Sequence, residues 1–160
     1  MKIEYVEESQ PLGTAGALSL IENPPTQNFV VSNGDVLTDV DYTELLNFLQ
    51  LHDAKGAMAV KLHEWTNPFG VVEMDGLKIT GFSEKPVLRS HVNAGIYALT
   101  PDVLNLLSPE EYCDMPTVFE LLAQGGEKVV AYPMYEPWLD VGRPDDLKTA
   151  QTIPLKKALG

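Results

Sequence analysis

The stretch Asn28-Phe29-Val30-Val31-Ser32-Asn33-Gly34-Asp35 joins a short apolar run to a carboxylate. Residues 28–32 have the apolar, β-branched character of a strand that is buried in an α/β sheet. Asp35 follows directly after a glycine, just past the end of that strand. Because ligands of open α/β sheets bind at the carboxyl ends of the strands, the stretch predicts both a core strand and a candidate binding position.

Strand and helix patterns alternate along the rest of the chain. Asp41 is the expected N-cap of the second helix, and Asp75-Gly76 is a hairpin signal between segments 69–74 and 77–82. The alternation predicts an α/β fold with a mostly parallel sheet and one antiparallel excursion. Strands are predicted at 2–6, 28–32, 57–62, 94–99 and 129–133, and helices at 14–22, 42–52, 101–107, 115–124 and 143–152.

The composition is that of one folded domain, residues 1–160, with 44% hydrophobic residues for a packed core. The 23 acidic and 11 basic residues give a net charge of −12. This charge argues against nucleic acid and anionic membranes as partners, since both are repelled. Neither a signal-peptide pattern nor an apolar run long enough to span a membrane is visible, so we expect a cytoplasmic protein.

A small, glycine-rich segment, Leu12-Gly13-Thr14-Ala15-Gly16-Ala17, stands between the first predicted strand and the first predicted helix. Backbone amides at a helix N-terminus that lacks bulky side chains let a phosphate or a flat base approach closely. The alternative is that the glycines serve only the tight packing of a turn.

Two aspartates follow apolar segments at positions suited to a metal. Asp35 is the first, and Asp140, in Trp138-Leu139-Asp140-Val141-Gly142, is the second. Mg²⁺ takes one or two protein carboxylates and completes its shell with water and substrate phosphates. The alternatives are a turn aspartate at Asp35 and a helix cap at Asp140.

Three further polar residues are candidates. Lys85 is a compact cation suited to a phosphate, and Glu84 beside it can accept hydrogen bonds from hydroxyl groups; a surface ion-paired turn is the alternative. Asn93 stands at a strand start and can present its amide to a ligand, unless it is a turn asparagine. The histidines show no metal-ligand spacing to one another and are interpreted as solvated or partly packed.

Taken in order, these motifs resemble those of the sugar-1-phosphate nucleotidylyltransferases. The resemblance runs from Ile3 to about Gln151, nearly the whole chain. It is specific because five separate segments occur in the family's order: Leu12 to Gly16, Asn33-Gly34-Asp35, Phe69-Gly70-Val71-Val72 with Glu84-Lys85-Pro86, Val92-Asn93-Ala94-Gly95-Ile96-Tyr97, and Trp138-Leu139-Asp140-Val141-Gly142-Arg143-Pro144.

The resemblance implies a Rossmann-like α/β fold and a Mg²⁺-dependent reaction. In that reaction a nucleoside triphosphate and a sugar 1-phosphate give a nucleoside-diphosphate sugar and pyrophosphate, by in-line phosphoryl attack. Carried over to this sequence, the roles are Asp35 and Asp140 as Mg²⁺ ligands, Lys85 on the sugar phosphate, Gly70, Glu84 and Asn93 at the sugar, and Leu12, Gly13 and Gly16 in the nucleoside pocket.

Glu8 bears on the choice of base. Family members that use uridine or thymidine triphosphates tend to carry Gln at the matching position, three residues before Pro11. A carboxylate only accepts hydrogen bonds, and guanine offers adjacent N–H donors whereas uracil offers one donor between two acceptors. Glu8 therefore favours GTP, and the details are most similar to mannose-1-phosphate guanylyltransferases and related guanylyltransferases that carry CBS domains.

The chain departs from the family at its start, where the Gly-rich loop with a Gly-Thr-Arg core is absent. We therefore expect an N-terminally truncated domain, the C-terminal two-thirds of the family's catalytic domain. In the family this loop helps to stabilise the transition state electrostatically, which is usually a large contribution to catalysis. We therefore expect this chain to be inactive alone. Open strand edges and apolar faces would favour a homo-oligomer.

The alternative is a non-catalytic partner that binds a nucleotide or sugar nucleotide and regulates a complete homologue. The presence of Asp35, Lys85 and Asp140 together speaks against long degeneration of the site.

Overall fold

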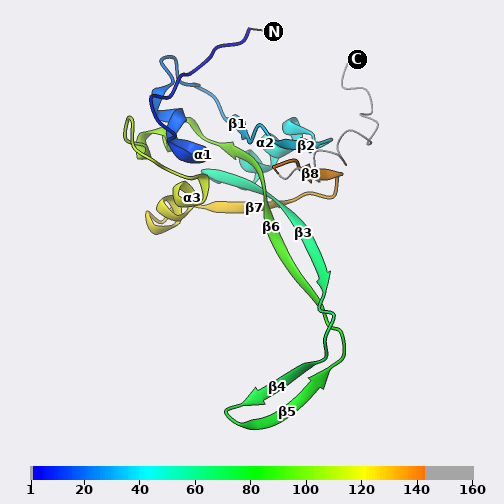
Figure 1. Ribbon diagram of the computed structural model, residues 1–160. Helices are drawn as coiled ribbons and strands as arrows, with labels where there is room; N and C mark the ends of the chain where they lie inside the picture. The colour runs from blue at the N-terminus through cyan, green and yellow to red at the C-terminus, as the bar shows by residue number, and fades with distance from the viewer. Residues whose placement is uncertain (1, 143–160) are drawn as a thin grey trace.

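A four-stranded mixed sheet forms the centre of the structure, a computed structural model that describes residues 2–142 (Figure 1). Its strands lie in the order β1 (Phe29–Ser32), β6 (Val87–Leu99), β3 (Gly56–Thr66) and β7 (Val129–Pro133). Two separate pairs accompany it, β2 (Val36–Thr38) with β8 (Trp138–Asp140) and β4 (Val71–Asp75) with β5 (Lys78–Ser83). Together with the helices described below, this confirms the predicted α/β class.

The sheet is mixed and not mostly parallel. β3 pairs in parallel with β7, whereas β6 pairs antiparallel with both β1 and β3. Strands β1, β3 and β7 therefore share one direction, but β6 separates β1 from β3. The prediction of a mostly parallel sheet is wrong because β6 is the return strand of the long hairpin that begins with β3, and such a strand pairs antiparallel with its partner.

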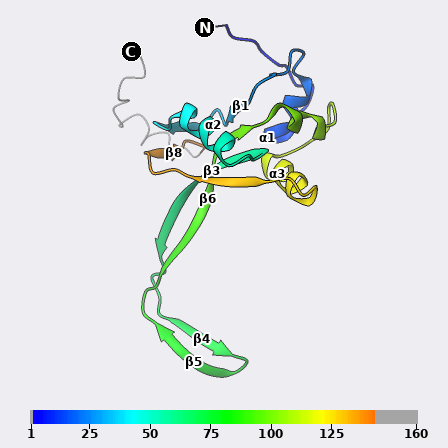
Figure 2. The same ribbon diagram turned by 180° about the vertical axis from the view of Figure 1, so that it is seen from behind.

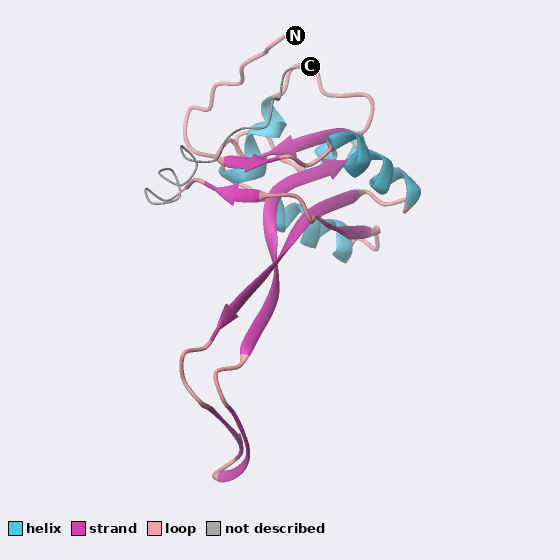
Figure 3. Cartoon of the chain, turned by 90° about the vertical axis from the view of Figure 1, so that its right-hand side faces the viewer, coloured by secondary structure: helices cyan, strands magenta, loops and turns pink. Residues whose placement is uncertain are grey.

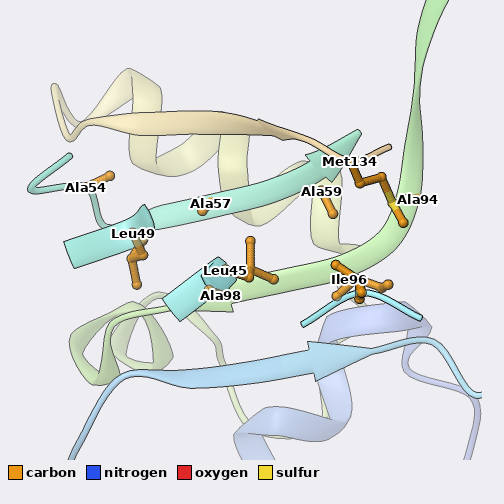
Figure 4. Close-up of a cluster of buried hydrophobic side chains, with 10 residues drawn as sticks. Leu45, Leu49, Ala54, Ala57, Ala59, Ala94, Ile96, Ala98 and Met134 are labelled. Carbon is orange, nitrogen blue, oxygen red and sulfur yellow. The ribbon is translucent and has the colours of Figure 1, made fainter. Parts of the chain in front are cut away.

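Helices cover both faces of the sheet. On one face, helix α2 (Tyr42–Leu51) buries Leu45 and Leu49, which are four residues apart on one side of the helix. They pack against small residues of the sheet, which let the helix approach closely (Figure 4): Ala57 and Ala59 of β3, and Ala94 and Ala98 of β6. Full burial of each leucine stabilises the fold by about 1.5–3 kcal/mol.

The opposite face is covered by helix α3 (Met115–Gln124) and the glycine-rich turn. Along β6, Ile96 belongs to the α2 side, whereas Tyr97 and Leu99 belong to the α3 side. This alternation places core side chains on both faces of one strand, which explains the unbroken apolar run from 94 to 99. Gly56 lets α3 pack closely, because a Cβ atom there would lie 3.1 Å from the ring of Phe119.

Several predicted elements are confirmed. α3 and β7 have the predicted bounds, and α2 ends one residue earlier than predicted. The predicted helix 14–22 is a short helix, α1 (Gly13–Gly16), followed by a 3₁₀-helix, η1 (Ala17–Leu20). The predicted helix 101–107 is also a 3₁₀-helix, η2 (Pro101–Leu106). No helix among residues 2–142 is long and apolar enough to cross a membrane.

The predicted strand at 2–6 is wrong. Residues 2–6 are exposed and take part in no ladder of the described sheets. An alternating pattern forms a strand only where another strand accepts and donates its backbone hydrogen bonds, and the described part of the chain offers this segment none. The predicted helix 143–152 lies outside the described residues.

The sheet extends on one side into an arm, defined here as residues 61–92. β3 and β6 leave the body together and remain paired as far as Thr66 and Val87, and the β4–β5 hairpin lies beyond them (Figures 1 and 2). Figure 3 shows the same projection from the side. The sequence predicted the β4–β5 hairpin but not the long extension of β3 and β6.

The far end of the arm has an exposed apolar face. Val72 pairs with Phe82, and Met74 pairs with Ile79, across a register shift between Glu73 and Met74. Because directly paired residues lie on the same face of a ladder, the shift gathers all four side chains on one side of the hairpin. Each of the four is at least 45% exposed, and Phe82 is 76% exposed.

Substitution of Asp41 tests the start of α2. The Asp41 carboxylate accepts hydrogen bonds from the backbone N–H groups of Thr43 at 2.7 Å and Glu44 at 3.4 Å. We expect Asp41→Ala to lower the free energy of unfolding by about 1 kcal/mol, measured by denaturant titration. Asp39→Ala removes the same charge without a cap and serves as the control; an equal loss in the two variants would contradict the capping role.

Candidate functional site

The short β2–β8 ladder brings Asp35 and Asp140 together. Val36, the residue after Asp35, lies opposite Asp140 in the antiparallel register. The Val141 N–H then donates to the Asp35 carbonyl oxygen at 2.8 Å. The two aspartates, 105 positions apart in the sequence, are therefore neighbours in the fold.

Their carboxylates converge on Gly142. A Cβ atom at Gly142 would lie 3.0 Å from Asp140 Oδ1 and 3.4 Å from Asp35 Oδ2, so both oxygens border the same small space. Asp140 Oδ1 also accepts a hydrogen bond from the Gly142 N–H at 2.9 Å. A side chain at position 142 would occupy this space, and the glycine keeps it open.

This pair fits Mg²⁺ better than a metal that needs a full protein cage. Within residues 2–142 there is no group of three or more His, Cys, Asp or Glu side chains suited to hold a metal. Two carboxylates that border one space match a cation that keeps several waters and takes its other ligands from substrate phosphates.

A cleft of about 690 Å³ opens beside the two carboxylates. Asn93 lines it together with Asp35 and Asp140, so the structure brings these three predicted site residues to one place. His63 and Trp138 also line it, and its described wall contains neither lysine nor arginine. An anion that enters this cleft meets two carboxylates and no opposing lysine or arginine of that wall.

Asn93 is held firmly at the cleft. Its Oδ1 accepts from the Gly95 N–H at 2.9 Å, as a turn asparagine does, and its Nδ2 donates to the Tyr97 hydroxyl at 2.8 Å. Burial raises the pKa of Tyr97 above its ordinary value. The tyrosine therefore stays neutral at physiological pH, with its oxygen free to accept from Asn93.

A second cleft, of about 440 Å³, lies between the glycine-rich turn and the Asp35 loop. Thr14 lines it on one side, and residues 31–35 line it on the other. Asp35 borders both clefts, so the turn predicted to bind the nucleoside shares a cleft with one of the two predicted metal ligands.

The glycines of the turn are required by packing. Gly13 has φ +79°, and a Cβ atom there would lie 2.6 Å from the Cys113 carbonyl oxygen. A Cβ atom at Gly16 would lie equally close to Leu12, which is itself buried. These contacts agree with the alternative interpretation, in which the glycines serve the tight packing of a turn. The nucleoside-binding roles of Leu12, Gly13 and Gly16 stay predictions.

The amides at the start of α1 are already used inside the protein. Those of Ala15 and Gly16 donate to the Cys113 carbonyl oxygen at 2.9 and 3.1 Å. The Thr14 amide donates to Asp114 Oδ1 at 3.0 Å. This bond, with a second one from the Tyr112 hydroxyl, holds the pKa of Asp114 below its usual range. The expectation that these amides cradle a phosphate is therefore not supported by their partners in this structure.

The remaining predicted residues lie away from the aspartate pair. Gly70, Glu84 and Lys85 are exposed residues of the arm, and a Cβ atom at Gly70 would lie 3.1 Å from Glu84 Oε2. The turn between β5 and β6, which carries Lys85, lies out along the arm (Figure 1). Glu8 is exposed in the segment before α1. The structure groups Gly70 with Glu84 but does not bring either, or Lys85, to the cleft.

Sequence reasoning did not select His63, Thr14 or Trp138 as site residues, although all three line the clefts. His63 lies one residue past the predicted strand 57–62, and a longer strand would have placed it on the same face as Lys61. For Trp138 the signal was present in the quoted motif, but its proximity to Asp35 depends on the β2–β8 pairing.

A family model described as nucleotidyl transferase matches residues 1–157. The chain is 32% identical to mannose-1-phosphate guanylyltransferase catalytic subunit beta of Danio rerio, over 98% of this chain and 45% of that protein. It is 34% identical to mannose-1-phosphate guanyltransferase of Aspergillus oryzae, over 97% of this chain and 44% of that protein. The chain thus spans less than half the length of these relatives.

Solved structures share the fold. A putative glucose-1-phosphate thymidylyltransferase from Bacillus anthracis, in complex with a sucrose, has a TM-score of 0.68 at 21% identity, over 96% of this chain and 65% of that one. HddC from Yersinia pseudotuberculosis, complexed with GMP-PN, has a TM-score of 0.59 at 20% identity, over 89% of this chain and 63% of that one. With the family match over nearly the whole sequence, the chain belongs to the nucleotidyl transferase family.

Proposed function

We propose that residues 1–160 are a single domain of a cytoplasmic, Mg²⁺-dependent sugar-1-phosphate nucleotidylyltransferase that uses GTP. The observation that carries the proposal is the convergence of Asp35 Oδ2 and Asp140 Oδ1 on Gly142. The similarity to mannose-1-phosphate guanylyltransferases supports the substrate class, GTP and a hexose 1-phosphate.

In the proposed reaction an oxygen of the sugar phosphate attacks the α-phosphorus of the nucleotide. A new P–O bond forms, and the bond to the β-phosphate bridge breaks, so pyrophosphate leaves with the electron pair. Mg²⁺, when bound to Asp35 and Asp140, would supply charge neutralisation for the phosphate oxygens. No side-chain nucleophile is needed, and the chain's own task is to position the substrates.

The charge of the cleft supports a metal-dependent reaction. The described wall of the cleft beside the aspartates contains two carboxylates and no lysine or arginine, in a chain of net charge −12. A triphosphate would be repelled by such a wall unless a divalent cation lay between them.

The proposed roles divide between the body and the arm. Asn93 would contact sugar hydroxyl groups from the cleft, with Gly70 and Glu84 from the arm, while Leu12, Gly13, Gly16 and Glu8 would form the nucleoside side. Lys85 would hold the sugar phosphate. Because the turn between β5 and β6, which carries Lys85, lies out along the arm (Figure 1), this role requires the arm to approach the cleft.

The metal site is tested by Asp140→Asn and Asp35→Asn. We expect each variant to bind Mn²⁺, a spectroscopic substitute for Mg²⁺, at least about tenfold more weakly than the unsubstituted chain in the presence of GTP. Electron paramagnetic resonance measures free Mn²⁺ in such a titration. Asp39→Asn makes the same charge change outside the cleft, and an equal loss of affinity in that control would contradict the assignment.

The base preference is tested by calorimetric titration with GTP and UTP. We expect GTP to bind about tenfold more tightly, because a carboxylate gains a charged hydrogen bond to guanine. Glu8→Gln should remove most of this preference without weakening UTP binding. Tighter binding of UTP by the unsubstituted chain would rule out the guanine assignment.

A non-catalytic nucleotide-binding partner is the second candidate. The internal use of the Thr14, Ala15 and Gly16 amides favours it, because those amides are not open to a triphosphate. A pyrophosphate-release assay with GTP, Mg²⁺ and mannose 1-phosphate tests the partner candidate together with the expectation that this chain is inactive alone. Release that depends on Asp140 would exclude a non-catalytic partner and overturn that expectation, whereas GTP binding without release agrees with both the truncated enzyme domain and the partner.

We also propose that the chain forms a homo-oligomer through the apolar face of the arm. Residues 61–92 contain four basic and four acidic side chains, a balance that contrasts with the net charge of −12 for the whole chain. An isolated two-stranded hairpin is marginally stable in water, and contact with a second apolar face would stabilise it.

Phe82→Thr tests this association. We expect the variant to raise the dissociation constant of the oligomer roughly tenfold, since Phe82 is the most exposed of the four side chains on that face. Analytical ultracentrifugation measures the constant. Leu51→Thr removes an exposed apolar side chain outside the arm and should have no effect; a monomeric unsubstituted chain would exclude the arm as an interface.

A further inference from the structure

The last backbone contact between β7 and the sheet is made at Val60. In the parallel β3–β7 register, Val60 is paired with Pro133. The next amide, that of Met134, donates to the Val60 carbonyl oxygen at 3.0 Å. The chain then leaves the sheet, and residues 134–137 connect it to β8, which carries Asp140. The position of Asp140 therefore depends on how this connection is held.

Lys61, the residue after Val60, holds the connection. Its Nζ donates to the carbonyl oxygens of Tyr135 at 3.0 Å and Glu136 at 2.8 Å. An ammonium group makes stronger hydrogen bonds to backbone oxygens than a neutral donor does. Lys61 is half-buried, and its bond to Glu136 is partly shielded from water, whereas its bond to Tyr135 is exposed.

Two neutral bonds complete the attachment. The Thr38 hydroxyl donates to the Pro137 carbonyl oxygen at 2.8 Å, and the Trp138 indole N–H donates to the Ala94 carbonyl oxygen at 2.9 Å. From 134 to 138 each residue is thus bound to β2, β3 or β6. Within this set of bonds, Lys61 contributes the charged donor and two of the contacts.

Lys61 also lies beside the cleft. Side chains two positions apart on a strand share a face, and β3 shows no register shift between Val60 and Thr66. Lys61 therefore shares the face of His63, which lines the cleft with Asp35 and Asp140.

We propose that Lys61 is a positioning residue that fixes residues 134–137 so that the Asp140 carboxylate stays beside Asp35. It acts through the backbone and touches neither substrate nor metal. The metal part of this inference rests on the proposed function. The geometric part, the attachment of β8 beside β2, stands on the hydrogen bonds alone.

Charge and position predict opposite effects when Lys61 is neutralised. Loss of a positive charge makes the protein more negative, which by itself favours a divalent cation. Loss of the attachment lets Asp140 move away from Asp35, which weakens cation binding. A decrease in affinity therefore identifies positioning.

The experiment compares three variants of the full chain by Mn²⁺ titration with GTP present. We expect Lys61→Met to weaken Mn²⁺ binding roughly tenfold, and Lys61→Arg to restore it to within about threefold, because the guanidinium can also donate to both carbonyls. Lys55→Met is the matched control, since Lys55, the residue before β3, donates a charged hydrogen bond at 2.6 Å to Asp102 of η2 and not to the connection to β8.

Amide hydrogen exchange gives a readout that needs no metal. The Val141 N–H reports on the β2–β8 pairing through its bond to the Asp35 carbonyl oxygen. We expect its exchange to accelerate about tenfold in Lys61→Met and to remain unchanged in Lys55→Met and Lys61→Arg.

The outcomes separate the two proposals. If Lys61→Met binds Mn²⁺ as tightly as the unsubstituted chain and protects Val141 equally, the positioning role is overturned while the metal site stands. If the unsubstituted chain binds no Mn²⁺, the proposed function fails, and the exchange of the Val141 amide still decides the positioning role.

Discussion

The antiparallel pairing of β2 with β8 is the interaction on which the site depends. It contains only three residue pairs, yet it joins a loop near the start of the chain to one near its end. Asp35 precedes the first residue of β2, and Asp140 is the last residue of β8. Because the strands run in opposite directions, these two ends meet. A parallel arrangement would have placed the carboxylates at opposite ends of the ladder.

A pair of strands this short does not hold itself in place. Its attachments come from the main sheet, through Lys61 on β3, Ala94 on β6 and the Asn33–Gly95 bond between the β1–β2 connection and β6. Gly95 adopts φ +72°, and a Cβ atom there would lie 2.8 Å from Asn33 Nδ2. Helices α2 and α3 pack on the two faces of that sheet, so the geometry of the two carboxylates depends on packing well away from them.

Local sequence patterns predicted the elements whose bounds are set by short-range interactions. α3 and β7 were predicted with their observed bounds, because Pro near the helix start, the double glycine after it and a β-branched run are strong short-range signals. Long-range pairing was not visible. The predicted strand at 2–6 does not form because no described strand pairs with it, and β6 pairs antiparallel with its neighbours in the sheet. The aspartates were selected from their positions after apolar runs, but their meeting depends on a register that alternation cannot specify.

The same limit explains the arm. Periodicity identified the β4–β5 hairpin, because Asp75-Gly76 lies between two apolar runs. Periodicity did not indicate how far β3 and β6 would remain paired. Apolar residues such as Leu62, Trp65 and Leu88 are compatible with both a core and a surface position, and the structure exposes them. The cleft beside the aspartates has carboxylates and an amide but no lysine or arginine in its described wall, while the turn between β5 and β6, which carries Lys85, lies out along the arm (Figure 1). A phosphate bound at the aspartates therefore needs a positive charge from outside that wall, whether a divalent cation, the arm, or both.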